Sequence, residues 1–407
     1  MVALSRIRED VVFEHIASLA GLWCDRCSVV RSRTHDLVDL IRLDAKLRSH
    51  LDGLEAAGTV GWELALEAAL WREPGNAFVL LAVAGLRGDR DQLESTVARF
   101  VYEDRLWPAL VSALAWLPSP LVAPMIDDWL EYDGPRWRAL GLASSVARRR
   151  DPRGAVGRGL LDHSLDVVRH AVRACEVFGC RTMIPTLRAL VDRAGLELVV
   201  TRALTVLGDL DGPARLWAFA RRGLEHAEDA AELAMRYVSV ATASPWLHHA
   251  AGDPALRRVV LVGAAATGSP ACVRWLLDAV HDPEVAALAG FGLYAMLGLD
   301  LDASGLALEP ESSNDLELPY PDGEGVEQWW QQHAKRFDHG RRYLLGRPLD
   351  TGVLREALLR APQRLRWLAA HDLHRLRIRH SVPFEVDAPG WRQQRWLGGL
   401  AAGPSIA

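Results

Sequence analysis

Residues 168–179, "VRHAVRACEVFG", decide the fold. This stretch mixes charged residues with the small residues Ala171, Ala174 and Cys175, and it stops on a glycine. Similar stretches along the chain end 30, 31, 30, 29, 60 and 30 residues apart, and the 60 covers two periods with a unit at 231–242 between them. Their last residues are Gly88, Pro118, Arg149, Gly179, Gly208, Gly268 and Gly298. A fixed spacing near 30 residues indicates a repeat array.

Each unit also begins with a second helical stretch, as in residues 119–133, 180–193 and 269–282. Apolar residues there recur every three or four positions, for example Ile184, Leu187 and Val191, and Gly, Asp and Pro separate the two halves. Small residues favour close packing of the second helix on its neighbours, and a final glycine supplies a left-handed C-cap. We therefore predict an all-α, right-handed α-solenoid of about eight helical pairs.

The repeat resembles the short HEAT-like repeats of bacterial proteins, in which "DxxVRxxAxxALG" marks the second helix. Asp166, Val168, Arg169 and Gly179 match that signature, and Ala174 lies near the expected alanine. The other units match it loosely. The resemblance implies an armadillo-like helical architecture, and it leaves the function open because such arrays serve many ends.

Composition divides the chain into four predicted segments. Residues 1–58 form an N-terminal helical cap with a stripe of leucines at 40, 43, 47, 51 and 54, and residues 59–298 form the array. Residues 299–327 form a linker with nine acids and no lysine or arginine, predicted to be extended or partly disordered. Residues 328–407 form a helical segment, in which 336–379 hold eleven arginines against four acids. Linker and tail neutralise each other in charge.

The totals exclude several classes of function. The net charge of −5 lacks the basic excess that binds nucleic acid or an anionic membrane. No window approaches the ~18 apolar residues that span a bilayer, and the N-terminus is a poor signal peptide. Five cysteines are too few and odd in number for a disulfide framework. We expect a cytoplasmic protein.

Residues with catalytic or metal-binding chemistry give little signal. Cys24 and Cys27 form a lone C-x-x-C without the second ligand pair of a zinc site, which favours a packing role. His371 and His374 lie one helical turn apart, but Asp372 points the other way around the helix. Nucleotide-binding and nucleophile-elbow motifs are missing from the sequence. We therefore expect no cofactor, no metal and no enzyme activity.

The two flanks carry a more particular resemblance, through "DLIRLDAKLRSHLDGLEAAG" (39–58), "LPYPDGEGVEQWW" (318–330), "RRYLLGRPL" (341–349) and "APGWRQQRWL" (388–397). Over nearly the whole chain it resembles an uncharacterised family of bacterial HEAT-repeat proteins that are often encoded near type VI secretion components. The resemblance implies a non-enzymatic scaffold or adaptor whose partner is a type VI secretion component or effector. The family features carried over as candidate protein-binding residues are Arg42, Asp44, His50, Asp52, Trp329 and Trp330.

Two alternatives stay open. One is an enzyme built on HEAT-like repeats, of the chromophore lyase or DNA glycosylase type, which requires a deep pocket with convergent polar groups. The other is a regulatory module whose arginine-rich tail is masked by the acidic linker. The oligomeric state and the binding face stay open as well.

Overall fold

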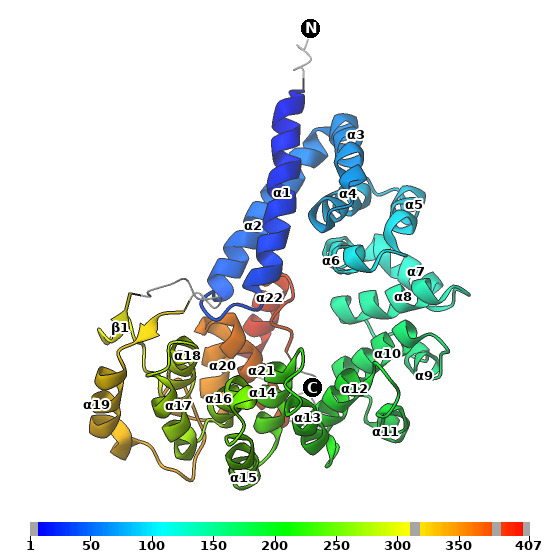
Figure 1. Cartoon of the computed structure of the whole chain (residues 1–407). Coiled ribbons are helices and arrows are strands. Elements are labelled where there is room, and N and C mark those ends of the chain that lie inside the picture. The colour runs from blue at the N-terminus through cyan, green and yellow to red at the C-terminus, as the bar shows by residue number, and fades with distance from the viewer. Residues whose placement is uncertain (1–6, 310–317, 377–383, 402–407) are drawn as a thin grey trace. The chain divides into compact units, whose positions relative to one another are not determined.

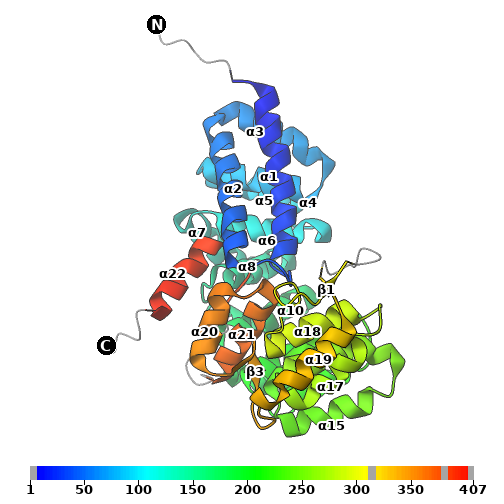
Figure 2. The same cartoon turned by 90° about the vertical axis from the view of Figure 1, so that its left-hand side faces the viewer.

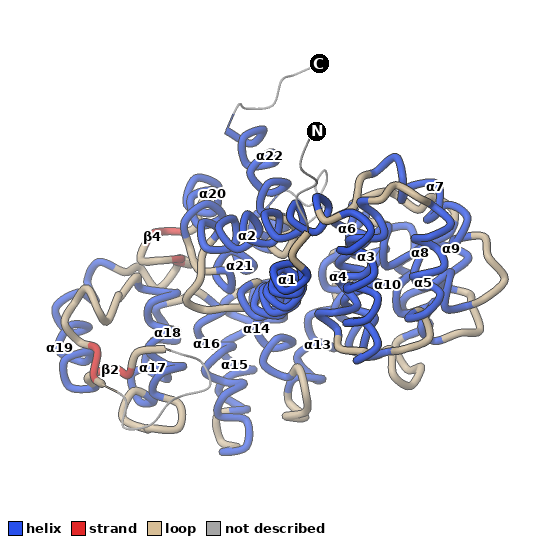
Figure 3. The backbone as a smooth tube through the Cα atoms, turned by 90° about the horizontal axis from the view of Figure 1, so that it is seen from above, coloured by secondary structure: helices blue, strands red, loops and turns tan. Residues whose placement is uncertain are grey.

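A computed structural model describes residues 7–309, 318–376 and 384–401 of the protein. These residues form an all-helical fold of 22 α-helices joined by short 3-10 turns, which confirms the predicted all-α class. Strands among the described residues make up two short antiparallel ladders, Ala307–Leu308 (β1) with Tyr320–Pro321 (β2) and Tyr343–Leu344 (β3) with Arg347–Pro348 (β4) (Figure 3). The chain divides into two compact units.

Unit one comprises Met1–Arg31, Leu37–Phe178 and Asp387–Ala407, and unit two comprises Ser32–Asp36 and Gly179–Val386. Each unit combines residues from several of the segments predicted above, so those segments stay predictions. The acidic stretch 299–327 holds β1, β2 and the start of a helix at Gly323, while its residues 310–317 lie outside the described ranges.

Unit one starts with two long helices, α1 (Glu9–Val29) and α2 (Leu37–Ala56), which lie side by side (Figure 2). Leu40, Leu47, Leu51 and Leu54 of the predicted leucine stripe are buried on α2. The remaining helices of this unit are α3 (Gly58–Ala68), η1 (Ala69–Trp71), α4 (Pro74–Leu86), α5 (Arg90–Phe100), η2 (Asp104–Leu106), α6 (Trp107–Trp116), α7 (Ser119–Leu130), α8 (Pro135–Arg148), α9 (Ala155–Leu160), α10 (Leu165–Phe178) and α22 (Gly390–Ala401).

Helices of unit one alternate between two rows. α4, α6, α8 and α10 form one row in which each helix contacts the next, while α5 packs on α4, α7 on α8 and α9 on α10 (Figure 1). The first row carries the small residues, because neighbouring helices approach closely there. A Cβ on Gly159 of α9, for instance, would lie 2.8 Å from the Cβ of Ala171 on α10. The small residues of residues 168–179 are therefore a packing feature.

Unit two repeats the alternation. α12, α14, α16 and α18 follow one another in contact, with α11, α13, α15 and α17 packed against them. α12 ends on Gly208, whose φ of 84° is the left-handed conformation that the predicted glycine C-cap requires. The helices in this row and beside it are η3 (Arg181–Met183), α11 (Ile184–Leu190), α12 (Glu197–Leu207), α13 (Gly212–Ala220), α14 (Ala227–Tyr237), α15 (Val240–Ala250), η4 (Pro254–Leu256), α16 (Arg257–Thr267), η5 (Pro270–Cys272), α17 (Val273–Ala279) and α18 (Ala286–Leu297).

After α18 the chain of unit two adds the two strand ladders and the helices α19 (Gly323–His333), η6 (Ala334–Arg336), α20 (Thr351–Arg360) and α21 (Gln363–Leu376). This segment runs along α16 and α18. The N–H of Tyr343 donates to the carbonyl of Gly268 at 2.7 Å, and the N–H of Leu345 donates to the carbonyl of Ala295 at 2.8 Å. The backbone of residues 343–346 thus satisfies acceptors that the two helices leave open at their C-terminal ends.

Candidate functional site

Four of the predicted binding residues lie on α2 in unit one. Arg42 and Asp52 are exposed and form surface ion pairs, Arg42 with Asp39 at 3.5 Å and Asp52 with Arg48 at 2.7 Å. Exposed pairs of this kind contribute little to stability. Both side chains are open to solvent for a partner.

Asp44 is buried and fastens α22 to the first two helices. One carboxylate oxygen accepts from Nε of Arg26 at 2.6 Å, and the other accepts from the N–H of Gly390 at 2.6 Å. Arg26 also donates to the carbonyl of Asp387 at 3.0 Å. Burial raises the pKa of the Asp44 carboxyl, and the charge of Arg26 opposes that rise. These contacts give Asp44 a structural role within unit one.

His50 faces His15 across the pair of long helices. The two Nδ1 atoms lie 2.9 Å apart, so one ring donates and the other accepts. Burial and the neighbouring His15 lower the pKa of His50. A hydrogen bond between neutral rings is therefore favoured at neutral pH.

Trp329 and Trp330 lie in unit two, on α19. Trp329 stacks on His333 with ring centroids 4.4 Å apart, and Trp330 lies 5.8 Å from the ring of Phe337. Both indoles are partly buried against the apolar core of unit two. The six predicted residues are thus divided between α2 of unit one and α19 of unit two.

The arginines of the C-terminal segment have structural partners. Arg342 donates to the carbonyls of Met235, Arg236 and Val238 at the end of α14. In unit one, Arg392 donates to the carbonyls of Ala147 on α8 and Ala115 on α6, at 2.8 and 2.9 Å. A cation at a helix C-terminus satisfies open carbonyls and interacts favourably with the helix dipole.

Two further contacts hold α21 against α14 in unit two. Arg364 pairs with Asp229 at 2.5 Å and with Glu232. Deeper in the unit, Arg236 and Asp372 form an ion pair at 3.0 Å with side chains only 1% and 0% exposed. Sequence reasoning missed these roles, because each arginine meets a helix more than a hundred residues away.

Large apolar side chains remain exposed at one kind of turn in unit one. Trp71 ends η1, while Tyr102, Tyr132 and Leu161 follow the ends of α5, α7 and α9. They are 79%, 69%, 55% and 77% exposed. Their spacing of 31, 30 and 29 residues places them at equivalent turns of successive helix pairs. We call these four residues the turn edge.

The equivalent turns of unit two differ. At further steps of 30 residues from Leu161 the chain has Val191, Arg221, Ala251 and His281. Val191 is buried, and the other three are polar or small. Among the described residues, the run of large exposed side chains at this turn position is therefore a property of unit one. An exposed apolar set of this kind marks an interaction surface.

Charged residues beside the turn edge neutralise one another. Ion pairs that join neighbouring turns are Arg72 with Glu103, Arg105 with Glu73, and Arg158 with Glu131. All are solvent-exposed and contribute little to stability. They leave the apolar rings as the main feature that a partner would meet.

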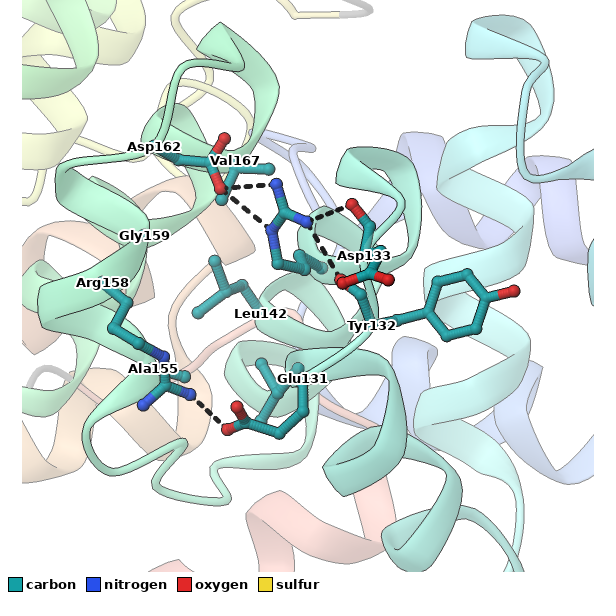
Figure 4. A pocket seen from close by; sticks show the side chains of 11 residues that line it. Glu131, Tyr132, Asp133, Leu142, Ala155, Arg158, Gly159, Asp162 and Val167 are labelled. Atoms are coloured by element: carbon teal, nitrogen blue, oxygen red, sulfur yellow. Dashed lines mark hydrogen bonds and ion pairs between the residues drawn. The ribbon is translucent and has the colours of Figure 1, made fainter.

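A cavity of about 260 Å³ opens beside Tyr132, between the turn after α7 and the helix α9 (Figure 4). Its central side chain, Arg138, donates to Asp162 at 2.9 Å and to the carbonyls of Tyr132 and Asp133 at 2.9 and 2.5 Å. At its rim, Arg158 pairs with Glu131. The Tyr132 ring points away from these side chains in Figure 4. The polar groups of this cavity are thus already paired with each other.

A second cavity, of about 290 Å³, lies between α5 and the turn that joins α7 to α8. Asp91, Glu94, Ser95 and Ala98 from α5 form one wall, and Tyr132 and Trp137 form the other. We call this cavity the α5 groove. Tyr132 borders both cavities, which places it at the centre of the candidate surface.

Metal-binding chemistry finds no support in the described part of the chain, where no three His, Cys, Asp or Glu side chains gather as a metal site. His371 lies 3.2 Å from the Tyr237 hydroxyl, while Nε2 of His374 donates to the carbonyl of Val206 at 3.0 Å. Burial raises the pKa of both Cys24 and Cys27. Over the same described residues, no helix has the length and apolar character to span a bilayer.

Comparison of the chain with protein families, with curated proteins and with solved structures finds no match.

Proposed function

We propose that this protein is a non-enzymatic adaptor that binds another protein through the turn edge of unit one. The observation that carries the proposal is the run of Trp71, Tyr102, Tyr132 and Leu161 in solvent at successive turns. We propose further that the helix pairs stack as the right-handed α-solenoid expected from the 30-residue period, which repeats one turn at regular intervals.

The physical argument rests on the cost of exposed rings. Burial of apolar surface yields about 25 cal/mol per Å², so an indole or phenol left in water offers binding energy to a partner. Tryptophan and tyrosine are enriched among the residues that dominate interfaces. Each side chain of the turn edge stands directly at the end of a packed helix, so little ordering is needed when the partner binds.

An adaptor accounts better for the cavities than an enzyme does. In the first cavity, Arg138 and Arg158 are paired with Asp162 and Glu131, so its polar groups do not converge on open space. Arg342 and Arg392 contact helix ends, which supports a structural role for the tail over a masked one. By the family resemblance, type VI secretion components and effectors are the first partners to test.

The test compares full-length variants as bait in native cell lysate, with captured proteins quantified by mass spectrometry. One variant carries Trp71→Ser, Tyr102→Ser and Leu161→Ser, which leaves the α5 groove intact. The matched control carries Leu210→Ser and Leu224→Ser, two residues of unit two that are 92% and 59% exposed. All these side chains are exposed, so both variants should keep the helical circular dichroism and melting temperature of the parent.

We expect a specific partner to be captured by the parent and by the control, and to be lost with the turn-edge variant. Equal capture by the turn-edge variant would contradict the proposal. Purified partner and chain should then bind with an affinity that the triple substitution reduces by at least about a hundredfold, the effect of losing two or three interface anchors.

A further inference from the structure

We infer that the α5 groove receives an arginine side chain of the bound partner. This inference rests on the proposed function and adds to it the chemistry of the partner. Tyr132 belongs both to the turn edge and to the groove, so a partner lying on the turn edge passes the mouth of the groove.

The shape of the groove follows from the helix and the turn that form it. Asp91, Glu94, Ser95 and Ala98 are spaced by three, one and three residues, which places them on one face of α5. The opposite wall is aromatic, with the rings of Tyr132 and Trp137 centred 5.8 Å apart at an angle of 57°. A volume of about 290 Å³ accommodates one long side chain.

The charge of the groove is negative. Two of its six lining residues are acidic and none is basic. The nearest base on α5, Arg90, is already paired with Asp128, and its Nε lies 4.0 Å from Glu94. The three carboxylates of Asp91, Glu94 and Asp128 therefore share one guanidinium. A cation entering the groove would meet unbalanced negative charge.

The aromatic wall favours arginine over other cations. A planar guanidinium stacks on an aromatic face and donates to two carboxylates at the same time. The chain provides an example in unit one, where the guanidinium of Arg136 lies over the ring of Trp107 at 4.6 Å. That arginine also donates to Asp104 at 2.6 Å and to Asp166 at 2.8 Å. The α5 groove offers the same combination of groups without an arginine of its own among its lining residues.

The experiment uses the full chain with ¹⁵N-labelled tryptophan and the probe Nα-acetyl-L-arginine methylamide, with the neutral citrulline analogue as its comparator. Indole N–H signals of Trp129 and Trp137 are assigned by Trp→Phe substitution. Trp129 is a second reporter because its indole N–H donates to Glu94 at 3.4 Å. We expect saturable shifts of these signals with the arginine amide and no saturable shift with the citrulline amide.

The critical variant is Asp91→Asn with Glu94→Gln, which keeps the shape of the groove and removes its charge. The control is Glu63→Gln with Glu67→Gln, an exposed pair on α3 that changes the net charge equally. We expect the first to weaken arginine-amide binding at least about tenfold and the second to leave it unchanged. Equal shifts with both amides, or equal weakening in both variants, would overturn the inference.

The two proposals fail separately. If the partner is lost with the turn-edge variant but the arginine amide does not bind, the adaptor function stands and the arginine inference is wrong. If the amide binds but the turn-edge variant captures the partner as well as the parent does, the turn edge is not the protein-binding surface.

Discussion

The guanidinium of Arg136 at the start of α8 donates to the carboxylate of Asp166 at the start of α10, over 2.8 Å, and the two residues stand 30 positions apart. Arg258 and Glu228 of unit two form a pair with the same separation, at 2.6 Å. Charged contacts thus follow the same period as the small residues. Neighbouring helix pairs are joined by an ion pair as well as by apolar packing.

Replacement of Arg136 tests the weight of that contact. Its guanidinium also pairs with Asp104, covers Trp107 and donates to the carbonyl of Val101 at 3.0 Å, and its side chain is mostly buried. Arg136→Gln should lower the free energy of unfolding by about 1–3 kcal/mol in urea titration. The control, Arg169→Gln, removes an exposed pair with the same Asp166 and should change it by less than about 0.5 kcal/mol. Equal effects would contradict a special role for Arg136.

His170 predicts a pH dependence of stability. Its ring stacks on Trp107 with centroids 5.4 Å apart, and burial lowers its pKa from 6.5 to about 4. The folded state therefore binds this proton less readily than the unfolded state, and stability is lost as pH falls from about 6.5 towards 4. Between pH 7 and pH 5 the loss from this group is about 2 kcal/mol.

The measurement is urea unfolding of the parent and of His170→Gln across that pH range. The difference between the two curves isolates His170, because His50 and the carboxylates titrate in both proteins. The variant should lose about 2 kcal/mol less than the parent between pH 7 and pH 5. Parallel curves would show that His170 titrates normally in the folded state.

The buried pair of Arg236 and Asp372 predicts an asymmetric response to mutation. Asp372→Asn leaves the Arg236 charge buried without its partner and should destabilise the protein by about 3–5 kcal/mol. Replacing both, with Arg236→Met and Asp372→Leu, should recover most of that loss because no charge remains buried. The surface change Glu356→Gln, which breaks an exposed pair with Arg347, should be nearly neutral. A double variant as unstable as the single one would contradict the electrostatic explanation.

Local patterns carry the part of the fold that the sequence predicts. The apolar period, the small residues and the final glycines act within one helix or between neighbouring helices, so the all-α class and the helix ends near Gly208 and Gly268 follow from them. The position of the tail does not. Arg342 meets the carbonyl of Met235, 107 residues away, and Arg392 meets that of Ala147, 245 residues away. Such contacts leave no periodic signal.

The candidate site was predictable only in part. The spacing of Trp71, Tyr102, Tyr132 and Leu161 is visible in the sequence, but an apolar residue at a helix end is equally compatible with burial, as Val191 demonstrates. Exposure decides between the two, and exposure depends on the neighbouring turns. Asp44 illustrates the converse, because an acid on a polar-looking helix is buried by contacts with Arg26 and Gly390.

Two glycines with the same backbone conformation separate strain from crowding. Gly268 and Gly305 have φ of 63° and 66°, so alanine at either position costs about 1–2 kcal/mol for the left-handed conformation. A Cβ at Gly268 would also lie 2.7 Å from the carbonyl oxygen of Tyr343, whereas nothing lies within 4 Å of one at Gly305. Gly268→Ala should therefore be more destabilising than Gly305→Ala, by about 1–3 kcal/mol in urea unfolding. Equal losses would mean that residues 343–346 move away from α16 at little cost, which would contradict their fixed hydrogen bonding to the helix end.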